Sequence, residues 1–173
     1  DVMYDYLPLF HIFGYLDGPM LSMAAGNRLI LTETFDPEAC LDAIETEGVT
    51  QISGFETHVK ALVDAQEARP RNLSTLRTGT FGAGTASAVP IYQKALEILA
   101  PLWPLTAYGM TEIGGNACLS YLDSTAEQVF NSSGPPCDGF EFRVIAPETG
   151  SHQPYEPPGE IVVKSYNLML CYS

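Results

Sequence analysis

The fold is decided by residues 28–54, which read RLILTETFDPEACLDAIETEGVTQISG. A short aliphatic run at each end flanks a segment whose apolar residues recur with helical spacing. Asp36 followed by Pro37 suits the N-cap and first turn of a helix, and Gly48 suits the left-handed position that ends one. This stretch therefore predicts a β-strand, an α-helix and a second β-strand.

The same alternation continues in both directions from this stretch. Strand-like runs occur at residues 2–7, 76–81 and 105–108, in addition to 28–32 and 50–54. Apolar stripes with helical spacing follow at 55–63 and 87–98. Strands that alternate with helices form a parallel sheet with right-handed crossovers. We therefore expect an α/β fold, with a mostly parallel sheet flanked by helices.

The pattern changes after about residue 120. Residues 141–145 and 160–164 alternate apolar and polar side chains, and a connection rich in Pro and Gly, 146–159, joins them. This arrangement predicts a short antiparallel β segment after the α/β part. We expect residues 1–130 to form the central α/β part of a domain and residues 131–173 a β-rich segment of the same domain.

Charge and composition narrow the class of protein. Eight Lys and Arg residues face 21 Asp and Glu residues, so the net charge is −13, while 46% of the residues are hydrophobic. A globular acidic domain of this kind disfavours nucleic acids and anionic membrane surfaces as partners. The longest uncharged stretch, 78–93, is too rich in Gly, Thr and Ser to span a membrane. Four scattered cysteines indicate neither a disulfide framework nor a zinc site, so we expect a cytoplasmic setting.

Candidate ligand-binding segments follow the predicted strands. Ligands of open parallel sheets bind outside the carboxyl ends of the strands, and four unusual segments are expected there: 10–14, 54–58, 82–85 and 108–112. The glycines in Gly82-Ala83-Gly84 allow close approach to the backbone, and Thr80 adds a hydroxyl. Tyr108 to Glu112 combine an aromatic ring, a hydroxyl and a carboxylate. A tight turn and a solvated glutamate are the alternative interpretations of these two segments.

Five ordered motifs identify a resemblance that covers nearly the whole chain. They are LPLFHIFG (7–14), GAG (82–84), TAYGMTE (106–112), SGPPCDGFEFRVI (133–145) and GEIVVKSYNLMLCY (159–172). In this order they resemble the adenylate-forming, AMP-binding superfamily of acyl-CoA synthetases, firefly-type luciferases and peptide-synthetase adenylation domains. The FHIFG segment resembles the acyl-CoA synthetase and luciferase branch, because amino-acid adenylation domains usually carry an aspartate-containing segment there.

The resemblance implies a ligase that activates a carboxylic acid with ATP. The products of that step are an acyl-adenylate and pyrophosphate, and the acyl group then passes to the thiol of coenzyme A. It further implies Mg²⁺, which spreads the charge of the departing pyrophosphate. A fatty or other apolar acid is the expected substrate. An adenylation domain that serves a carrier protein, and a non-catalytic nucleotide- or acyl-binding module on the same scaffold, remain as alternatives.

The resemblance also assigns roles to individual residues. Tyr108 resembles the residue that stacks on adenine, with the backbone of Gly82, Ala83 and Gly84 on the other side of the ring. Thr111 resembles the hydroxyl that contacts the phosphate, and Glu112 matches the carboxylate that coordinates Mg²⁺. His11 matches a histidine near the carboxylate and the entry of the thiol arm. By this resemblance the catalytic candidates are His11, Thr111 and Glu112.

Candidates for the acyl pocket flank the two key loops. By the same resemblance they are Phe13, Asp17, Gly109, Met110, Ile113, Gly114 and Gly115, although each of these residues could instead serve packing. His58 either lies near the acyl site or begins a helix, and His152 is expected to be solvated.

Several features of the resembled family have no match in this chain. The phosphate loop with its lysine is expected before residue 1. The aspartate that holds the ribose, the hinge and the C-terminal lid with its catalytic lysine are expected after residue 173. We therefore expect the 173 residues alone to be catalytically inactive.

Overall fold

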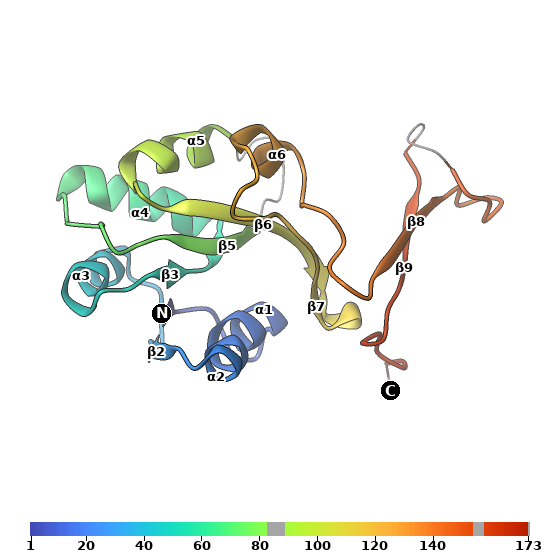
Figure 1. Ribbon diagram of the computed structural model, residues 1–173, viewed down its shortest axis with the longest axis horizontal. Helices are drawn as coiled ribbons and strands as arrows, with labels where there is room; N and C mark the ends of the chain where they lie inside the picture. Colours follow the sequence, from blue (N-terminus) through green and yellow to red (C-terminus); the bar gives the residue numbers. More distant parts are fainter. Residues whose placement is uncertain (83–88, 154–157, 173) are drawn as a thin grey trace.

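The computed structural model describes residues 1–82, 89–153 and 158–172. Within these residues, seven strands form one sheet in the order β2-β1-β3-β5-β6-β7, with β4 beside β5 (Figure 1). The strands are β1 (Val2–Asp5), β2 (Arg28–Leu31), β3 (Gln51–Ile52), β4 (Gly54–Phe55), β5 (Thr78–Gly82), β6 (Trp103–Met110) and β7 (Gly115–Leu119). All pairs are parallel except β6 with β7. The predicted α/β class with a mostly parallel sheet is confirmed.

Helices cover both sides of this sheet. They are α1 (Ile12–Tyr15), the π-helical turn η1 (Leu16–Met20), α2 (Leu21–Ala25), α3 (Pro37–Glu47), α4 (Glu56–Ala68), α5 (Val89–Ile98), the 3₁₀ turn η3 (Thr111–Ile113) and α6 (Ala126–Asn131). Figure 1 shows α4, α5 and α6 on one side of β5 and β6, and α1 and α2 on the other. No helix in the described part of the chain is long and apolar enough to cross a membrane.

The helix predicted from residues 36–48 forms as its sequence indicates. Asp36 Oδ1 accepts hydrogen bonds from the backbone N–H groups of Glu38 (2.9 Å) and Ala39 (3.2 Å), which satisfies two donors of the first turn. Gly48 ends the helix with φ +69°, a conformation that glycine adopts without strain. The inner face of α3 carries Leu41 and Ile44 into the core.

The core lies between α3, α4, α5 and the parallel strands. Its largest fully buried side chains include Phe81, Leu41, Ile44, Ile52, Leu62, Leu76 and Leu99. Burial also raises the pKa of the Cys40 thiol to about 12, so this cysteine serves as an apolar core residue.

Three elements of the fold are not predicted, and one strand is longer than predicted. The helical segment from α1 to α2 and the strand β7 carry weak signals: Gly14, Gly18 and Pro19 are poor helix formers, and β7 begins with a glycine of φ +104°. β6 continues through Gly109 and Met110, beyond the predicted strand end at Tyr108, because β7 pairs with that end of the strand. Helix α6 is the third unpredicted element.

The predicted antiparallel segment is confirmed. β8 (Glu141–Ile145) pairs with β9 (Glu160–Lys164) in the register Glu141 to Lys164. Figure 1 shows this ribbon projecting from the main sheet beyond β7. The preceding segment is tied to the sheet because the Cys137 N–H donates to the Ala117 carbonyl at 2.8 Å. The boundary between residues 130 and 131 stays a prediction.

A buried guanidinium joins α3 to the loop after α4. The Arg71 side chain is only 1% exposed, and its Nε donates to Asp42 Oδ1 at 2.9 Å, while a second nitrogen pairs with Glu38. It also donates to the carbonyls of Ala65 (3.2 Å) and Arg69 (2.7 Å). One side chain thus satisfies acceptors from two helices and from the loop that follows α4.

We predict that Arg71→Ala lowers the free energy of unfolding by roughly 2–3 kcal/mol, because it removes several charge-assisted hydrogen bonds and the packing of a buried side chain. Arg77→Ala is the matched control, since the Arg77 side chain is 56% exposed and forms a surface ion pair with Asp1. The control should lose less than about 1 kcal/mol. Urea unfolding followed by circular dichroism measures both values, and equal losses would contradict the structural role of Arg71.

Two carboxylates are buried where η1 packs on the end of β1. Asp5 is 3% exposed and Asp17 is 8% exposed. Gly18 permits this packing, since a Cβ there would lie 2.0 Å from Asp5 Oδ2. Desolvation by burial raises the pKa of Asp17 to about 6, with a further increase from the charge of Asp5, although hydrogen bonds to Thr80, Ser53 and Asn116 act in the opposite direction.

We predict that Asp17→Asn stabilises the fold above pH 6. A folded-state pKa of about 6, above the ordinary value of 3.8, favours the protonated carboxyl, so this contribution to stability is lost as the pH rises through 6. The amide cannot ionise, so Asp17→Asn should raise the free energy of unfolding by roughly 1–2 kcal/mol near pH 7.5 and change it little near pH 3, below the ordinary pKa of 3.8. Urea titrations at the two pH values, with the exposed Asp123→Asn as control, measure this difference. A destabilisation of equal size at both values would contradict it.

Candidate active site

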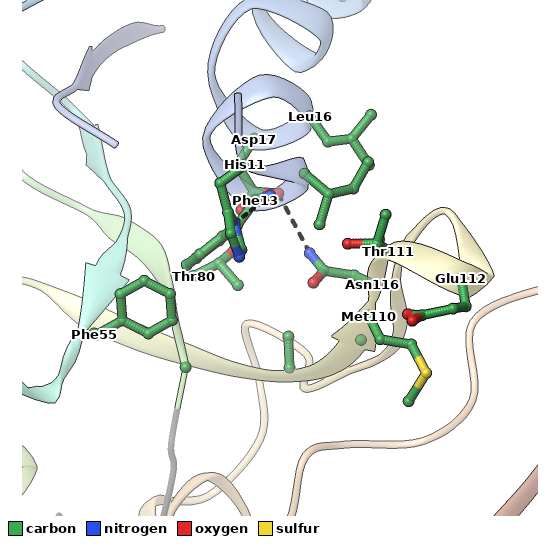
Figure 2. A pocket seen from close by; sticks show the side chains of 15 residues that line it. His11, Phe13, Leu16, Asp17, Phe55, Thr80, Met110, Thr111, Glu112 and Asn116 are labelled. Atoms are coloured by element: carbon green, nitrogen blue, oxygen red, sulfur yellow. Dashed lines mark hydrogen bonds between the residues drawn. The ribbon is translucent and has the colours of Figure 1, made fainter. Parts of the chain in front are cut away.

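A cavity of about 350 Å³ lies between the α1–η1 segment and the carboxyl ends of β5 and β6. Figure 2 shows it from close by. Its lining residues are His11, Ile12, Phe13, Leu16, Asp17, Phe55, Thr80, Gly82, Ala107, Gly109, Met110, Thr111, Glu112, Gly115 and Asn116. The position agrees with the rule that ligands of parallel sheets bind at the carboxyl edge of the strands.

The cavity brings together all four segments expected at this edge. His11, Phe55, Gly82 and Glu112 represent one segment each. Ala83 and Gly84, which are expected to line the nucleotide site, lie outside the described residues.

His11 is held at the start of α1. Its ring Nδ1 accepts a hydrogen bond from the backbone N–H of Phe13 at 3.1 Å, and the backbone N–H of His11 donates to the Pro8 carbonyl at 3.0 Å. Because Nδ1 is an acceptor, the proton of the neutral ring belongs on Nε2. The imidazole is exposed at the cavity, so Nε2 is available as a donor to a bound molecule.

Apolar side chains form much of the wall. The ring of Phe13 packs against that of Phe55 edge to face, with centroids 5.3 Å apart. Leu16 and Met110 complete this lining, and Figure 2 shows Phe55 across the cavity from Thr111. Such a surface suits the hydrocarbon part of a ligand.

Thr111 and Glu112 open η3 directly after β6. The Glu112 carboxylate accepts a hydrogen bond from the Tyr172 hydroxyl at 2.5 Å, and this bond lowers the pKa of Glu112. The backbone carbonyl of Glu112 accepts from the Met169 N–H at 2.9 Å. The C-terminal segment therefore fixes an ionised carboxylate next to an exposed hydroxyl.

A single carboxylate of this kind fits Mg²⁺ better than a metal with an all-protein cage. The described residues contain no group of three or more His, Cys, Asp or Glu side chains that could hold a metal. Mg²⁺ usually takes one or two carboxylates, with the remaining ligands supplied by water and substrate phosphates. Glu112 is the residue that would hold the ion.

Tyr108 does not line the cavity. Its neighbours Ala107 and Gly109 do, and alternate residues of a strand face opposite sides of the sheet. The Tyr108 ring instead meets Phe142 of β8 edge to face, at a centroid distance of 6.2 Å. A role in stacking on adenine would therefore place the base outside this cavity, on the side of β6 that faces β8.

Two of the three predicted pocket glycines shape the wall. A Cβ on Gly109 would lie 2.1 Å from the Gly115 carbonyl oxygen, so glycine is required where β6 and β7 approach at a bulge. A Cβ on Gly115 would lie 2.4 Å from Leu16 Cδ1, so the missing side chain leaves room for Leu16. A Cβ on Gly114 would instead meet Asn167, and Gly114 and Ile113 lie outside the lining.

The remaining histidines lie outside the cavity. His58 belongs to the first turn of α4, where its Nδ1 accepts from the Phe55 N–H at 3.0 Å, as expected for a helix-start histidine. Burial lowers its pKa. His152 is exposed and pairs with Ile145 beside the β8–β9 ribbon.

Asn116 is the polar lining residue that the sequence does not reveal. Its Nδ2 donates to Asp17 Oδ1 at 3.3 Å, from β7 to η1. Neither of these two elements is predicted, so no sequence pattern indicates their contact.

Known proteins resemble this chain over most of its length. A CoA ligase of Mycobacterium tuberculosis, named 3-[(3aS,4S,7aS)-7a-methyl-1,5-dioxo-octahydro-1H-inden-4-yl]propanoyl:CoA ligase, is 32% identical over 95% of this chain and 30% of its own length. The mitochondrial medium-chain acyl-CoA ligase ACSF2 of Bos taurus is 28% identical over 95% of this chain and 27% of its own length. The chain thus spans less than a third of these relatives.

Solved structures agree with the fold. o-Succinylbenzoate coenzyme A synthetase of Bacillus subtilis, in complex with ATP and magnesium ion, superposes with a TM-score of 0.82 at 28% identity, over 99% of this chain and 34% of that one. The model of the family described as AMP-binding enzyme matches residues 1–173. The resemblance found in the five motifs is therefore confirmed, and the chain belongs to the AMP-binding enzyme family.

Proposed function

We propose that this chain carries the acid-binding side, and part of the nucleotide-binding side, of an AMP-forming acid–CoA ligase. The observation that carries the proposal is the single cavity that joins Thr111 and Glu112 to the apolar wall of Phe13, Leu16 and Phe55. An enzyme that couples a carboxylic acid to a nucleotide needs these two environments side by side. The names of the relatives, among them acyl-CoA and 4-coumarate–CoA ligases, support the same reaction class.

The reaction has two steps. The substrate carboxylate attacks the α-phosphorus of ATP, the bond to the β-phosphate oxygen breaks, and acyl-AMP and pyrophosphate form. The thiol of coenzyme A then releases its proton to solvent and attacks the acyl carbonyl, the bond between the acyl carbon and the phosphate oxygen breaks, and acyl-CoA and AMP form. The first step supplies the leaving group that a free carboxylate lacks, and the cavity wall keeps water from the mixed anhydride.

Named residues support these steps. The Thr111 hydroxyl can donate a hydrogen bond to a phosphate oxygen, and Glu112 would hold Mg²⁺, which neutralises charge on the departing pyrophosphate. His11 Nε2 can donate to the substrate carboxylate or to the acyl carbonyl oxygen. Tyr108, with the backbone of residues 82–84, forms the adenine site in this proposal.

The apolar wall favours an acid with a hydrocarbon portion, which supports the expectation of a fatty or other apolar acid. In this proposal the substrate acid binds in the cavity of about 350 Å³, and its hydrocarbon portion contacts the ring of Phe13. Coenzyme A is the proposed acceptor, because the curated relatives are CoA ligases. Action in the cytoplasm and use in fatty-acid metabolism belong to the proposal as well.

In the proposed function, groups other than the described cavity lining supply positive charge for the triphosphate of ATP. Among the described residues that line the cavity, none is Lys or Arg. Lys60, Lys94 and Lys164 pair with Asp64, Glu67 and Glu141, respectively. This distribution supports the expectation that the 173 residues alone do not complete the reaction.

The test is acid-dependent exchange of labelled pyrophosphate into ATP, followed by acyl-CoA formation. The protein translated from the complete gene is assayed with Mg²⁺ and a panel of fatty, aryl and polycyclic acids. We expect exchange with at least one apolar acid and thioester formation with free coenzyme A. Binding of nucleotide without any exchange would favour a non-catalytic module, and exchange without CoA thioester would favour a carrier-protein acceptor.

We predict that Glu112→Gln lowers the rate of pyrophosphate exchange by about 100-fold or more, because the amide is neutral and a weaker ligand for Mg²⁺. Raising the Mg²⁺ concentration should partly restore the rate. Glu97→Gln on α5 is the matched control, because Glu97 is exposed and far from the lining of the cavity. An unchanged rate in Glu112→Gln would remove Glu112 from the metal site.

A further inference from the structure

The cavity contains a buried polar pair within its apolar wall. Asp17 of η1 is 8% exposed, and Asn116 of β7 donates a hydrogen bond to its Oδ1 at 3.3 Å. Figure 2 shows the two side chains pointing toward each other, on the side of Thr80 and Phe13. Asp17 is an ionisable side chain in a wall otherwise suited to hydrocarbon.

This pair has an energetic cost for the fold. Burying a carboxylate without a paired cation is unfavourable even when it is hydrogen-bonded, and burial raises the pKa of Asp17. The neighbouring Asp5 adds a second buried carboxylate, and its Oδ2 has no hydrogen-bond partner among the residues that the structure describes. The fold gains no cation in return, because no Lys or Arg among the described residues contacts either carboxylate. A ligand that bonds to Asp17 would offset this cost.

The hydrogen-bond donors and acceptors that Asp17 and Asn116 leave unused define which chemical group of a ligand can bind to them. The Asp17 carboxylate accepts hydrogen bonds from Thr80, Ser53 and Asn116, which leaves about one of its four acceptor positions for a ligand, while the Asn116 amide retains one N–H. A hydroxyl group can donate to Asp17 and accept from Asn116 at the same time. A ketone satisfies only the amide, and a second carboxylate on the substrate would be repelled by Asp17.

We propose that Asp17 and Asn116 form a polar subsite that binds a hydroxyl group on the acyl part of the substrate. The preferred acid is then a hydroxylated aliphatic acid instead of a plain fatty acid. This inference rests on the proposed function and narrows its substrate class. The pair determines specificity and takes no part in bond making or breaking.

The expected preference for a hydroxylated acid over a plain one follows from the hydrogen bonds that a plain chain cannot form with Asp17 and Asn116. A plain chain in this cavity would cover the buried carboxylate and amide without bonding to them, and such a mismatch is strongly selected against. We expect kcat/KM to be roughly 10- to 100-fold higher for the best hydroxylated acid than for its unsubstituted parent.

The experiment compares octanoate with a set of octanoates that each carry one hydroxyl, at successive positions of the chain. The protein translated from the complete gene is used in the pyrophosphate-exchange assay, and calorimetry gives the Kd of each acid as a second readout. Asp17→Leu should invert the preference, with a gain for octanoate and a loss of about 10-fold or more for the hydroxylated acid. Asn116→Leu, on a different element, should reduce the preference in the same direction.

Asp123→Asn is the control for removal of one acidic charge, since Asp123 is exposed and lies outside the cavity. Thermal unfolding verifies that each variant is folded, and Asp17→Asn, which keeps the shape of the side chain, replaces Asp17→Leu if that variant is unfolded. An equal preference for both acids in the wild type and in all variants overturns the subsite. Absence of exchange with every acid overturns the proposed function instead, and the Kd ratio then decides the subsite independently.

Discussion

The site depends on the close approach of neighbouring backbones at the carboxyl edge of the sheet. A Cβ on Gly79 would lie 1.4 Å from the Ile52 carbonyl oxygen, so β5 and β3 can take their positions only with glycine there. A Cβ on Gly109 would lie 2.1 Å from the Gly115 carbonyl oxygen, which sets the same limit on β6 and β7. The first contact sets β5 against β3 and the second sets β7 against β6, and the cavity opens beside the carboxyl ends of β5 and β6.

Two carboxylates at this edge have opposite electrostatic environments. A hydrogen bond from Tyr172 lowers the pKa of Glu112, whereas burial raises that of Asp17. Divergent environments give carboxylates divergent tasks. An ionised, accessible group suits a cation, and a buried group beside an amide suits a neutral hydrogen-bonding ligand. In the proposed function, Glu112 would thus serve the nucleotide and Asp17 the acid, a division that the net charge of −13 does not reveal.

Local signals predicted the elements that are regular and missed those that depend on tertiary contacts. The cap at Asp36 and the left-handed Gly48 defined α3 because both act within the helix itself. The helical segment from α1 to α2 depends on the packing of Gly18 over Asp5, and β7 depends on pairing with β6. Neither dependence is visible in a window of adjacent residues. The motifs therefore located His11, Thr111 and Glu112, while the partner of Asp17 came only from the structure.

This difference has a consequence for substrate choice. The residues proposed to handle phosphate and metal follow β6, in a motif that is read directly from the sequence. The residues proposed to contact the acyl group come largely from η1 and β7, whose positions are set by packing. The relatives are named for acids as different as a medium-chain acyl group and 4-coumarate. Likeness to the family therefore constrains the common chemistry more strongly than the acid, and contacts such as Asp17 with Asn116 are where the choice of acid has to be sought.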